Sequence, residues 1–157
     1  MGFLNKIKAM KNAVTGGAAT VVLECDQLSF TAPFTVVVKV TTESAPVKVN
    51  SVYLKIKGHE EIEVPDVDVV YDDEEEETYR RVEVVRAFDD TVNLEIEVAG
   101  AQELEANQSY EWKVDVELPS DAPAIYEGRY CQHTYSAFAG LDCFGNDPDS
   151  GWVELSD

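Results

Sequence analysis

Apolar and polar residues alternate along most of this chain, which is the period expected of a β-strand with one buried face. The segment 47–58 shows the pattern clearly, with five apolar residues that we expect in the core: Val47, Val49, Val52, Leu54 and Ile56. The alternation changes from odd to even positions near Asn50 and Ser51, which predicts a β-bulge at that point.

Segments with this alternation recur at intervals of about ten residues, as they do in β-sandwiches and barrels. We predict strands at 18–25, 34–42, 47–58, 59–64, 67–71, 78–88, 92–100, 112–118, 129–139 and 152–155. No region has the length or composition of a linker between domains. We therefore interpret residues 17–157 as a single all-β sandwich domain with nine or ten strands.

The first fourteen residues have a different pattern. They contain three lysines and no acidic residue, and their apolar residues fall at helical spacing: Phe3, Leu4, Ile7, Met10 and Val14. This predicts a short amphipathic helix that ends at Gly16 and Gly17, so residues 1–16 are assigned to a helix and hinge. Three roles fit such a helix: covering one end of the sandwich, docking on a partner protein, or weak contact of residues 1–14 with an anionic membrane.

The stretch 112–142, WKVDVELPSDAPAIYEGRYCQHTYSAFAGLD, joins two strands through a corner that contains Pro119 and Pro123. Proline lacks a backbone donor and has a fixed φ, so the corner should be extended rather than helical. The stretch resembles the arrestin-like family, which has a tryptophan strand, a similar proline corner and a tyrosine strand that ends in AGLD. Residues 18–58 resemble the same family through two valine-rich strands and a third strand that ends at Gly58.

The resemblance implies an immunoglobulin-like β-sandwich of the arrestin N-domain type, most similar to the bacterial and archaeal sporulation-control-like members. It also implies an adaptor or regulator that binds proteins and has no catalytic activity. Typical members carry two tandem sandwiches, whereas this sequence accounts for one, and the phosphate-sensing residues of animal arrestins have no matching positions here. An unrelated immunoglobulin-like sandwich is the alternative fold.

Acidic residues outnumber basic ones by 31 to 12, which gives a formal net charge of −19. Nucleic-acid binding depends on clustered lysine and arginine, so this charge argues against a nucleic-acid partner. It favours solubility, including in a saline interior, or steering toward a basic partner. No secretory signal or membrane span is predicted, and Cys25, Cys131 and Cys143 are interpreted as reduced thiols of a cytoplasmic protein.

Few residues have the spacing of a catalytic or metal site. His59 and His133 are the only histidines, and no nucleophile motif accompanies them, so we predict no enzymatic activity and no cofactor. Cys131 and His133 share one face of a strand, and with Cys25 and Cys143 they are a weak alternative as zinc ligands.

The acidic segment 66–77 is the basis of an alternative function, a ligand- or calcium-binding module. Its candidate cation ligands are Asp66, Asp68, Asp72 and Asp73. The segment lacks the spaced ligands of a calcium loop, so a solvated run of like charges is the simpler interpretation.

The leading prediction is a cytoplasmic adaptor that binds other proteins through a sheet edge, loops or the N-terminal helix. The candidate contact residues are Phe3, Leu4, Ile7 and Met10 in the helix, Phe144 in the turn-rich loop 140–151, and the edge strand with Val67, Val69 and Tyr71. Pairing of that edge with a second copy would give a homodimer. Trp112 and Tyr135 are interpreted as core anchors.

Overall fold

The computed structural model describes residues 18–157, and within this range the chain is all-β. The strands are β1 (Ala19–Cys25), β2 (Phe34–Thr42), β3 (Val47–Asp72), β4 (Glu77–Ala99), β5 (Gln102–Leu104), β6 (Ser109–Val116), β7 (Tyr126–Glu127), β8 (Cys131–Cys143) and β9 (Val153–Leu155). The predicted N-terminal helix and hinge, residues 1–16, lie outside the described residues. Within 18–157 there is no helix with the length and apolar character needed to cross a bilayer.

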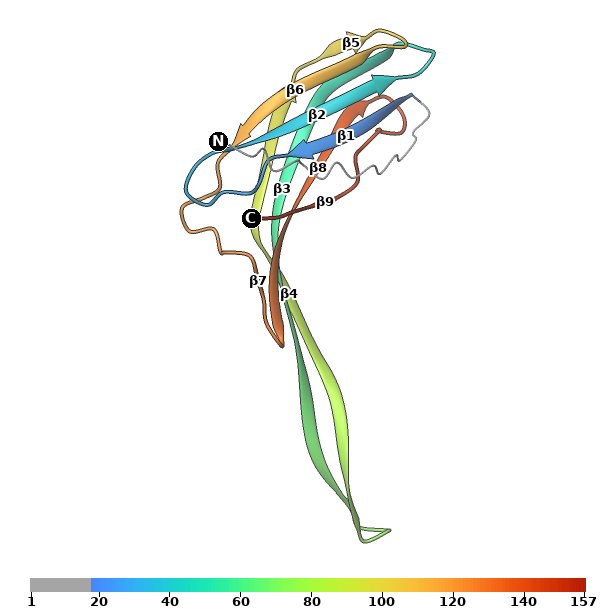
Figure 1. Ribbon diagram of the computed structural model, residues 1–157. Coiled ribbons are helices and arrows are strands. Elements are labelled where there is room, and N and C mark those ends of the chain that lie inside the picture. Colours follow the sequence, from blue (N-terminus) through green and yellow to red (C-terminus); the bar gives the residue numbers. More distant parts are fainter. Residues whose placement is uncertain (1–17) are drawn as a thin grey trace.

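The strands form two antiparallel sheets that face each other (Figure 1). The smaller sheet has the order β1-β2-β6, and the larger has the order β4-β3-β8-β7, with β5 added beside β3 and β9 beside β8. Antiparallel sheets of this kind bury one face and leave the other in water. The predicted all-β sandwich fold is therefore confirmed.

The core lies between the two sheets and is built from alternate residues of each strand. In β2, for example, Val36, Val38 and Val40 are fully buried. All five residues predicted as core in β3 are also buried: Val47, Val49, Val52, Leu54 and Ile56. The predicted bulge is confirmed as well, because the pairing of β3 with β8 shifts register between Val49 and Ser51.

The two predicted aromatic anchors have different environments. Tyr135 in β8 is fully buried, and its hydroxyl donates a hydrogen bond of 2.7 Å to the carbonyl oxygen of Pro123. This bond ties the proline corner to the core. Trp112 in β6 is only partly buried and stacks on Tyr110, with 5.9 Å between the ring centroids.

The middle of the chain differs from the prediction. The expected strands 59–64 and 67–71 both belong to β3, and the expected strands 78–88 and 92–100 merge into β4. Pro65 does not interrupt β3, because successive residues of a strand direct their backbone groups to opposite edges. The Glu63 N–H donates to the Tyr130 carbonyl on the β8 side, so Pro65 also faces that side and removes no hydrogen bond to β4.

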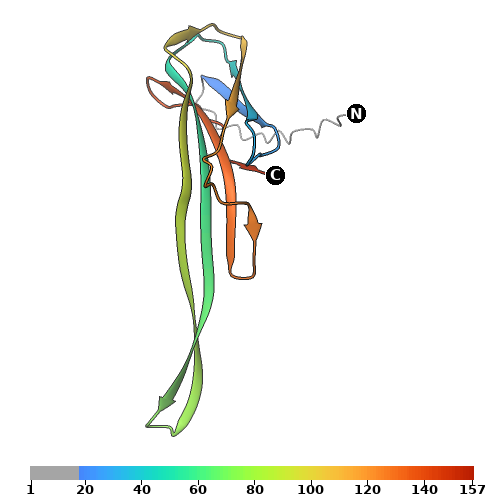
Figure 2. The ribbon, with the colours of Figure 1, turned by 90° about the vertical axis from the view of Figure 1, so that its left-hand side faces the viewer.

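The two layers differ in length, and this difference sets the shape of the molecule. Strands β1, β2 and β6 have seven, nine and eight residues, whereas β3 and β4 have 26 and 23. The two long strands therefore continue past the end of the sandwich as a two-stranded ribbon, which both ribbon views show (Figures 1 and 2).

Gly58 lies where β3 leaves the core. A Cβ atom at this position would lie 2.7 Å from Thr91 Oγ1 and 2.9 Å from Cε1 of the buried Tyr135. Tyr135 is fully buried in the close-packed core, and the Thr91 hydroxyl is held by its hydrogen bond to His133, so both neighbours resist displacement. We predict that Gly58→Ala lowers the free energy of unfolding by about 1–3 kcal/mol, measured by urea unfolding followed by tryptophan fluorescence.

Gly100→Ala is the matched control, because a Cβ atom at Gly100 would have Glu97 Oε1 as its nearest neighbour, at 3.8 Å. This substitution should stay within about 0.5 kcal/mol of the parent protein. Equal losses for the two variants would contradict the close packing at Gly58.

Candidate functional site

The ribbon that leaves the sandwich is the candidate functional site. It comprises residues 63–86, here called the arm: the end of β3, a turn at 73–76 and the beginning of β4. The last partner of β3 in β8 is Cys131, which pairs with Ile62, and Tyr130 then accepts one further hydrogen bond from the Glu63 N–H. Beyond that point β3 pairs with β4 alone, and no described residue forms a second layer on the arm (Figure 2).

The cross-strand register divides the side chains of the arm between two faces. Pro65 pairs with Val84 and Val67 pairs with Val82, and residues two apart on a strand share a face. We call six residues the apolar face: Pro65, Val67, Val69, Tyr71, Val82 and Val84. Apart from Pro65, the side chains of the apolar face are 49–66% exposed, so the strip is open to solvent. Two polar residues lie on the same side of the ribbon, because Arg80 pairs with Val69 and Thr78 pairs with Tyr71.

The opposite side of the arm, here called the acidic face, carries most of the charge on its strands. Its charged cross-strand pairs are Asp66–Glu83, Asp68–Arg81 and Asp72–Glu77. Like charges directly opposite each other destabilise a strand pair, so two of these pairs oppose formation of the arm. The turn adds four more acids, and residues 63–86 contain ten acidic and three basic residues in all.

Two ion pairs stabilise the arm only at its surface. Arg86 Nε lies 3.0 Å from Glu63 Oε2 at the base, and Arg81 pairs with Glu83 along β4. Exposed ion pairs of this kind contribute at most about 1 kcal/mol, and an isolated two-stranded hairpin is marginally stable in water. A contiguous exposed apolar strip on such a ribbon is typical of a surface that packs against another molecule.

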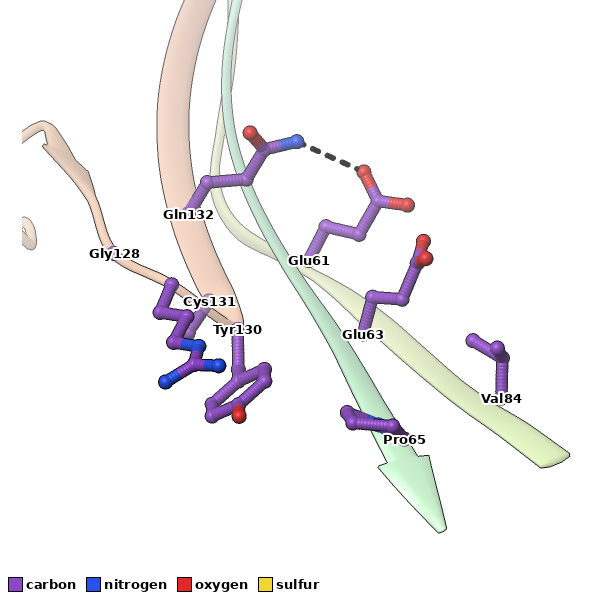
Figure 3. Close-up of a pocket in the computed structure, with 9 residues that line it drawn as sticks. Glu61, Glu63, Pro65, Val84, Gly128, Tyr130, Cys131 and Gln132 are labelled. Atoms are coloured by element: carbon purple, nitrogen blue, oxygen red, sulfur yellow. Dashed lines mark hydrogen bonds between the residues drawn. The ribbon is translucent and has the colours of Figure 1, made fainter. Parts of the chain in front are cut away.

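A hollow of about 530 Å³ lies at the base of the arm, where β8 begins and β3 continues (Figure 3). Glu61, Glu63 and Pro65 line it from β3, and Tyr130 lines it from the turn before β8. The Gln132 side-chain amide donates a hydrogen bond of 3.1 Å to Glu61 across one side of it. The hollow therefore continues the line of β8 along the free edge of β3.

A small charged cluster holds the two strands together on the sandwich side of the arm. Lys57 Nζ lies 2.9 Å from Asp90 Oδ2, and His59 Nδ1 lies 2.9 Å from Asp90 Oδ1. The hydrogen bond from Lys57, followed by that from His59, holds the pKa of Asp90 below its ordinary value. The cluster sits at the register shift between Gly58 and His59, where β3 is still paired with both β4 and β8.

The residues predicted for partner binding lie in three places. Val67, Val69 and Tyr71 are on the apolar face of the arm, on a β3 edge that is free beyond the hydrogen bond to Tyr130. Phe144 lies in the loop after β8 and is fully exposed, far from any other predicted contact in sequence. The helix residues Phe3, Leu4, Ile7 and Met10 lie outside the described residues.

The β4 half of the apolar face was missed as a site from the sequence. Val82 and Val84 belong to it only because they pair with Val67 and Pro65, and register is not visible in a single strand. A signal was present, since alternating apolar residues flank the acidic turn on both sides, which is typical of a hairpin.

The calcium-binding alternative treated 66–77 as an acidic loop, but most of this segment is strand. Asp66, Asp68 and Asp72 lie within β3, and only 73–76 form the turn. The Asp72 carboxylate accepts the N–H groups of Glu74 and Glu75 at 2.9 and 3.4 Å, so it shapes the turn. Within residues 18–157, no three acidic, histidine or cysteine side chains are grouped as metal ligands.

The four proposed zinc ligands cannot form one shell. Cys131 and Cys143 are the two ends of β8, a strand of 13 residues, which separates them by about 40 Å. Burial, and then the charge of Asp26, raises the pKa of Cys25 to about 12, and burial also raises the pKa of Cys143. Both are therefore thiols at neutral pH, a form with little nucleophilicity.

His133 is fully buried, and its Nε2 lies 2.6 Å from the Thr91 hydroxyl. Its Nδ1 has no hydrogen-bond partner among the described residues, so the pair lacks the third group that orients a catalytic base. Nearby, hydrogen bonds to Cys131 and then to Glu60 raise the pKa of the Tyr126 hydroxyl. Neither arrangement has the features of an activated nucleophile.

Comparisons with known proteins support the fold. No family model matches the chain, and no curated protein sequence matches it. Among solved structures, the chain is similar to Spo0M, the sporulation control protein from Bacillus subtilis, with a TM-score of 0.58 and 17% identity. The match covers 89% of this chain and 49% of that one, so this chain spans about half its length. At this identity the likeness shows the arrestin-like sandwich fold alone.

We predict that the arm opens far more often than the sandwich in a dilute solution of the protein. The amides of Asp66 and Asp68 have only β4 beside them, whereas those of Leu54 and Ile56 belong to a strand paired on both sides. Hydrogen exchange of the Asp66 and Asp68 amides should be at least about a hundredfold faster than that of the Leu54 and Ile56 amides. Equal protection at low protein concentration would contradict the marginal stability assigned to the arm.

Proposed function

We propose that this chain is a non-catalytic regulatory protein that binds a protein partner through the apolar face of its arm. One observation carries the proposal: six apolar side chains lie on one face of a two-stranded ribbon, and no described residue covers them. Covering a half-exposed valine recovers roughly 1 kcal/mol of hydrophobic free energy. A partner that covers this face would therefore also stabilise the arm that binds it.

The name of the structural neighbour, a sporulation control protein, agrees with a regulatory role. The likeness is one of fold, and the function proposed for this chain depends on its own arm. The arrangement of Thr91 and His133 supports the absence of catalysis, since no third group orients the imidazole. All three cysteines are unpaired, which supports a reducing compartment such as the cytoplasm.

The test compares the same change, two valines replaced by threonine, on each of the two faces of the arm. Val67→Thr with Val82→Thr places two hydroxyls on the apolar face, and Val64→Thr with Val85→Thr makes the same change on the acidic face. Threonine keeps the β-branched shape, so the strands should still pair. A hydroxyl buried without a partner costs about 1–3 kcal/mol, so the first variant should bind a partner at least tenfold more weakly.

The measurement is affinity capture from native lysate with the parent chain and both variants, each first shown to be folded by circular dichroism. We expect a discrete partner that is retained by the acidic-face variant and lost by the apolar-face variant. Identical retention by all three proteins, or no partner above background for the parent, would refute the proposed function.

A further inference from the structure

A partner of the arm must match two properties, an apolar strip and a strong negative charge. The apolar face runs from Pro65 to Tyr71, seven residues that span about 20 Å along β3. The arm as a whole carries ten acidic residues against three basic ones. Most of the acids on its strands lie on the opposite face, and the charged strand residues on the side of the apolar face are Glu63, Arg80 and Arg86. An apolar segment of about that length with basic residues at its margins has both complementary properties.

The first residues of this chain have that chemistry. Residues 3–14 contain three lysines and no acid, and a helix of twelve residues is about 18 Å long. At about 100° per residue, Lys6 and Lys8 lie on either side of the stripe formed by Phe3, Leu4, Ile7, Met10 and Val14, and Lys11 lies within the stripe, between Ile7 and Leu4. Packing that stripe on the apolar face would bring three lysines onto an arm with a net charge of −7, from three basic and ten acidic residues.

The segment cannot reach the arm of its own copy. The Ala18 carbonyl accepts a hydrogen bond of 3.1 Å from the Glu43 N–H, shortly before β3 begins at Val47. The chain therefore joins the sandwich at the end opposite the arm, as Figure 1 shows. Pro65 lies 18 residues after Val47, which places it about 60 Å from the start of β3.

The length of chain between the segment and Ala18 sets a limit on its reach. Residue 14 is four residues from Ala18 and lies within about 14 Å of it, and residue 3 lies within about 53 Å even if the chain is fully extended. Residues 3–14 therefore cannot cover the strip from Pro65 to Tyr71 of the same molecule. An occupant made of these residues has to come from another molecule.

We propose that the apolar face of the arm binds residues 3–14 of a second copy of this chain. The inference rests on the proposed function of the arm as a protein-binding surface, and it names the partner. Two copies that lie side by side in opposite directions bring each basic segment to the arm of the other. One two-fold axis then fills both sites, which gives a closed dimer.

A second arm is a less suitable occupant of the same face. Two arms packed on each other would bring together two ribbons that each carry ten acidic residues and three basic ones. Juxtaposed like charges disfavour such a contact. The basic segment carries the opposite charge and so avoids this repulsion.

The experiment measures self-association of the full chain by sedimentation equilibrium. We expect a dimer whose affinity falls at least about tenfold when the segment carries Ile7→Asp with Met10→Asp, because two charges enter its apolar stripe. The Val67→Thr with Val82→Thr variant should lose affinity to a similar extent. Circular dichroism and urea unfolding establish that both variants keep the sandwich.

Each variant has a matched control. Ala9→Asp with Ala13→Asp adds the same two charges on the side of the predicted helix away from the stripe. Val64→Thr with Val85→Thr makes the valine change on the acidic face. Val64→Thr with Val85→Thr should dimerise within about threefold of the parent affinity. Ala9→Asp with Ala13→Asp lowers the charge of the segment but keeps its stripe, so it should lose clearly less affinity than Ile7→Asp with Met10→Asp.

A mixture separates this arrangement from other dimers. The segment variant keeps an intact arm, and the arm variant keeps an intact segment, so an equimolar mixture restores one of the two sites. We expect heterodimers in the mixture at concentrations where each variant alone is monomeric. Absence of such heterodimers contradicts exchange of the segment between copies.

Two further results would overturn the inference. One is a parent chain that stays monomeric at about 100 µM, where even an affinity of about 10 µM would give mostly dimer. The other is a dimer that needs the apolar face but tolerates Ile7→Asp with Met10→Asp, because that dimer packs arm on arm. If lysate capture still depends on the apolar face in either case, the proposed function stands and only the identity of the partner is wrong.

Discussion

A sheet can bury apolar side chains only along the length of the layer that faces it. In this protein the facing layer ends near Gly58, whose missing side chain leaves room for Tyr135. Ile56, just inside that limit, is 1% exposed, whereas Ile62, on the same side of β3, is 37% exposed. Past the limit both sides of β3 are exposed: Val64 continues the core side, and Val67 and Val69, on the apolar face, continue the outer side.

The arm has features that restrict how this exposed surface can associate. Pro65 removes a donor from the free edge of β3, and the acidic turn repels the turn of any second arm beside it. Both devices act against uncontrolled pairing of strand edges, which is the usual danger of an open ribbon. They leave the apolar face accessible, so recognition through side chains is favoured over addition of a strand.

The sandwich itself was predictable from the sequence because burial imposes a period of two. Val52, Leu54 and Ile56 alternate with polar residues, and the bulge near Ser51 follows from a break in that alternation. The continuity of β3 was not predictable in the same way, because proline and a run of acids ordinarily end a strand. Pro65 is tolerated only because its nitrogen faces an edge that has no partner strand. The edge is free because β8 begins at Cys131, beside Ile62, and does not reach Pro65.

The candidate site was predictable only in part, for a related reason. Val67, Val69 and Tyr71 were identified from their own alternation, but Val82 and Val84 join them through the register of a hairpin. Six consecutive acids, 72–77, form the turn of that hairpin and its two flanking positions. Phe144 is exposed as expected, yet it stands outside the arm. Sequence pattern therefore located the strand that matters, and pairing was needed to define the face.

The distribution of charge adds a last constraint on what the arm can bind. The chain carries 12 basic residues against 31 acidic ones, yet its first fourteen residues hold three lysines and no acid. Such a segment is attracted to almost any part of an acidic surface, and attraction of that kind is weak and screened by salt. Specific binding needs an apolar contact at the same place.

Elsewhere in the described residues, large exposed apolar side chains such as Phe144 and Trp152 do not form an ordered row. On the arm, a row of apolar side chains and a high density of acids coincide, so the combination selects this surface over the rest of the sandwich.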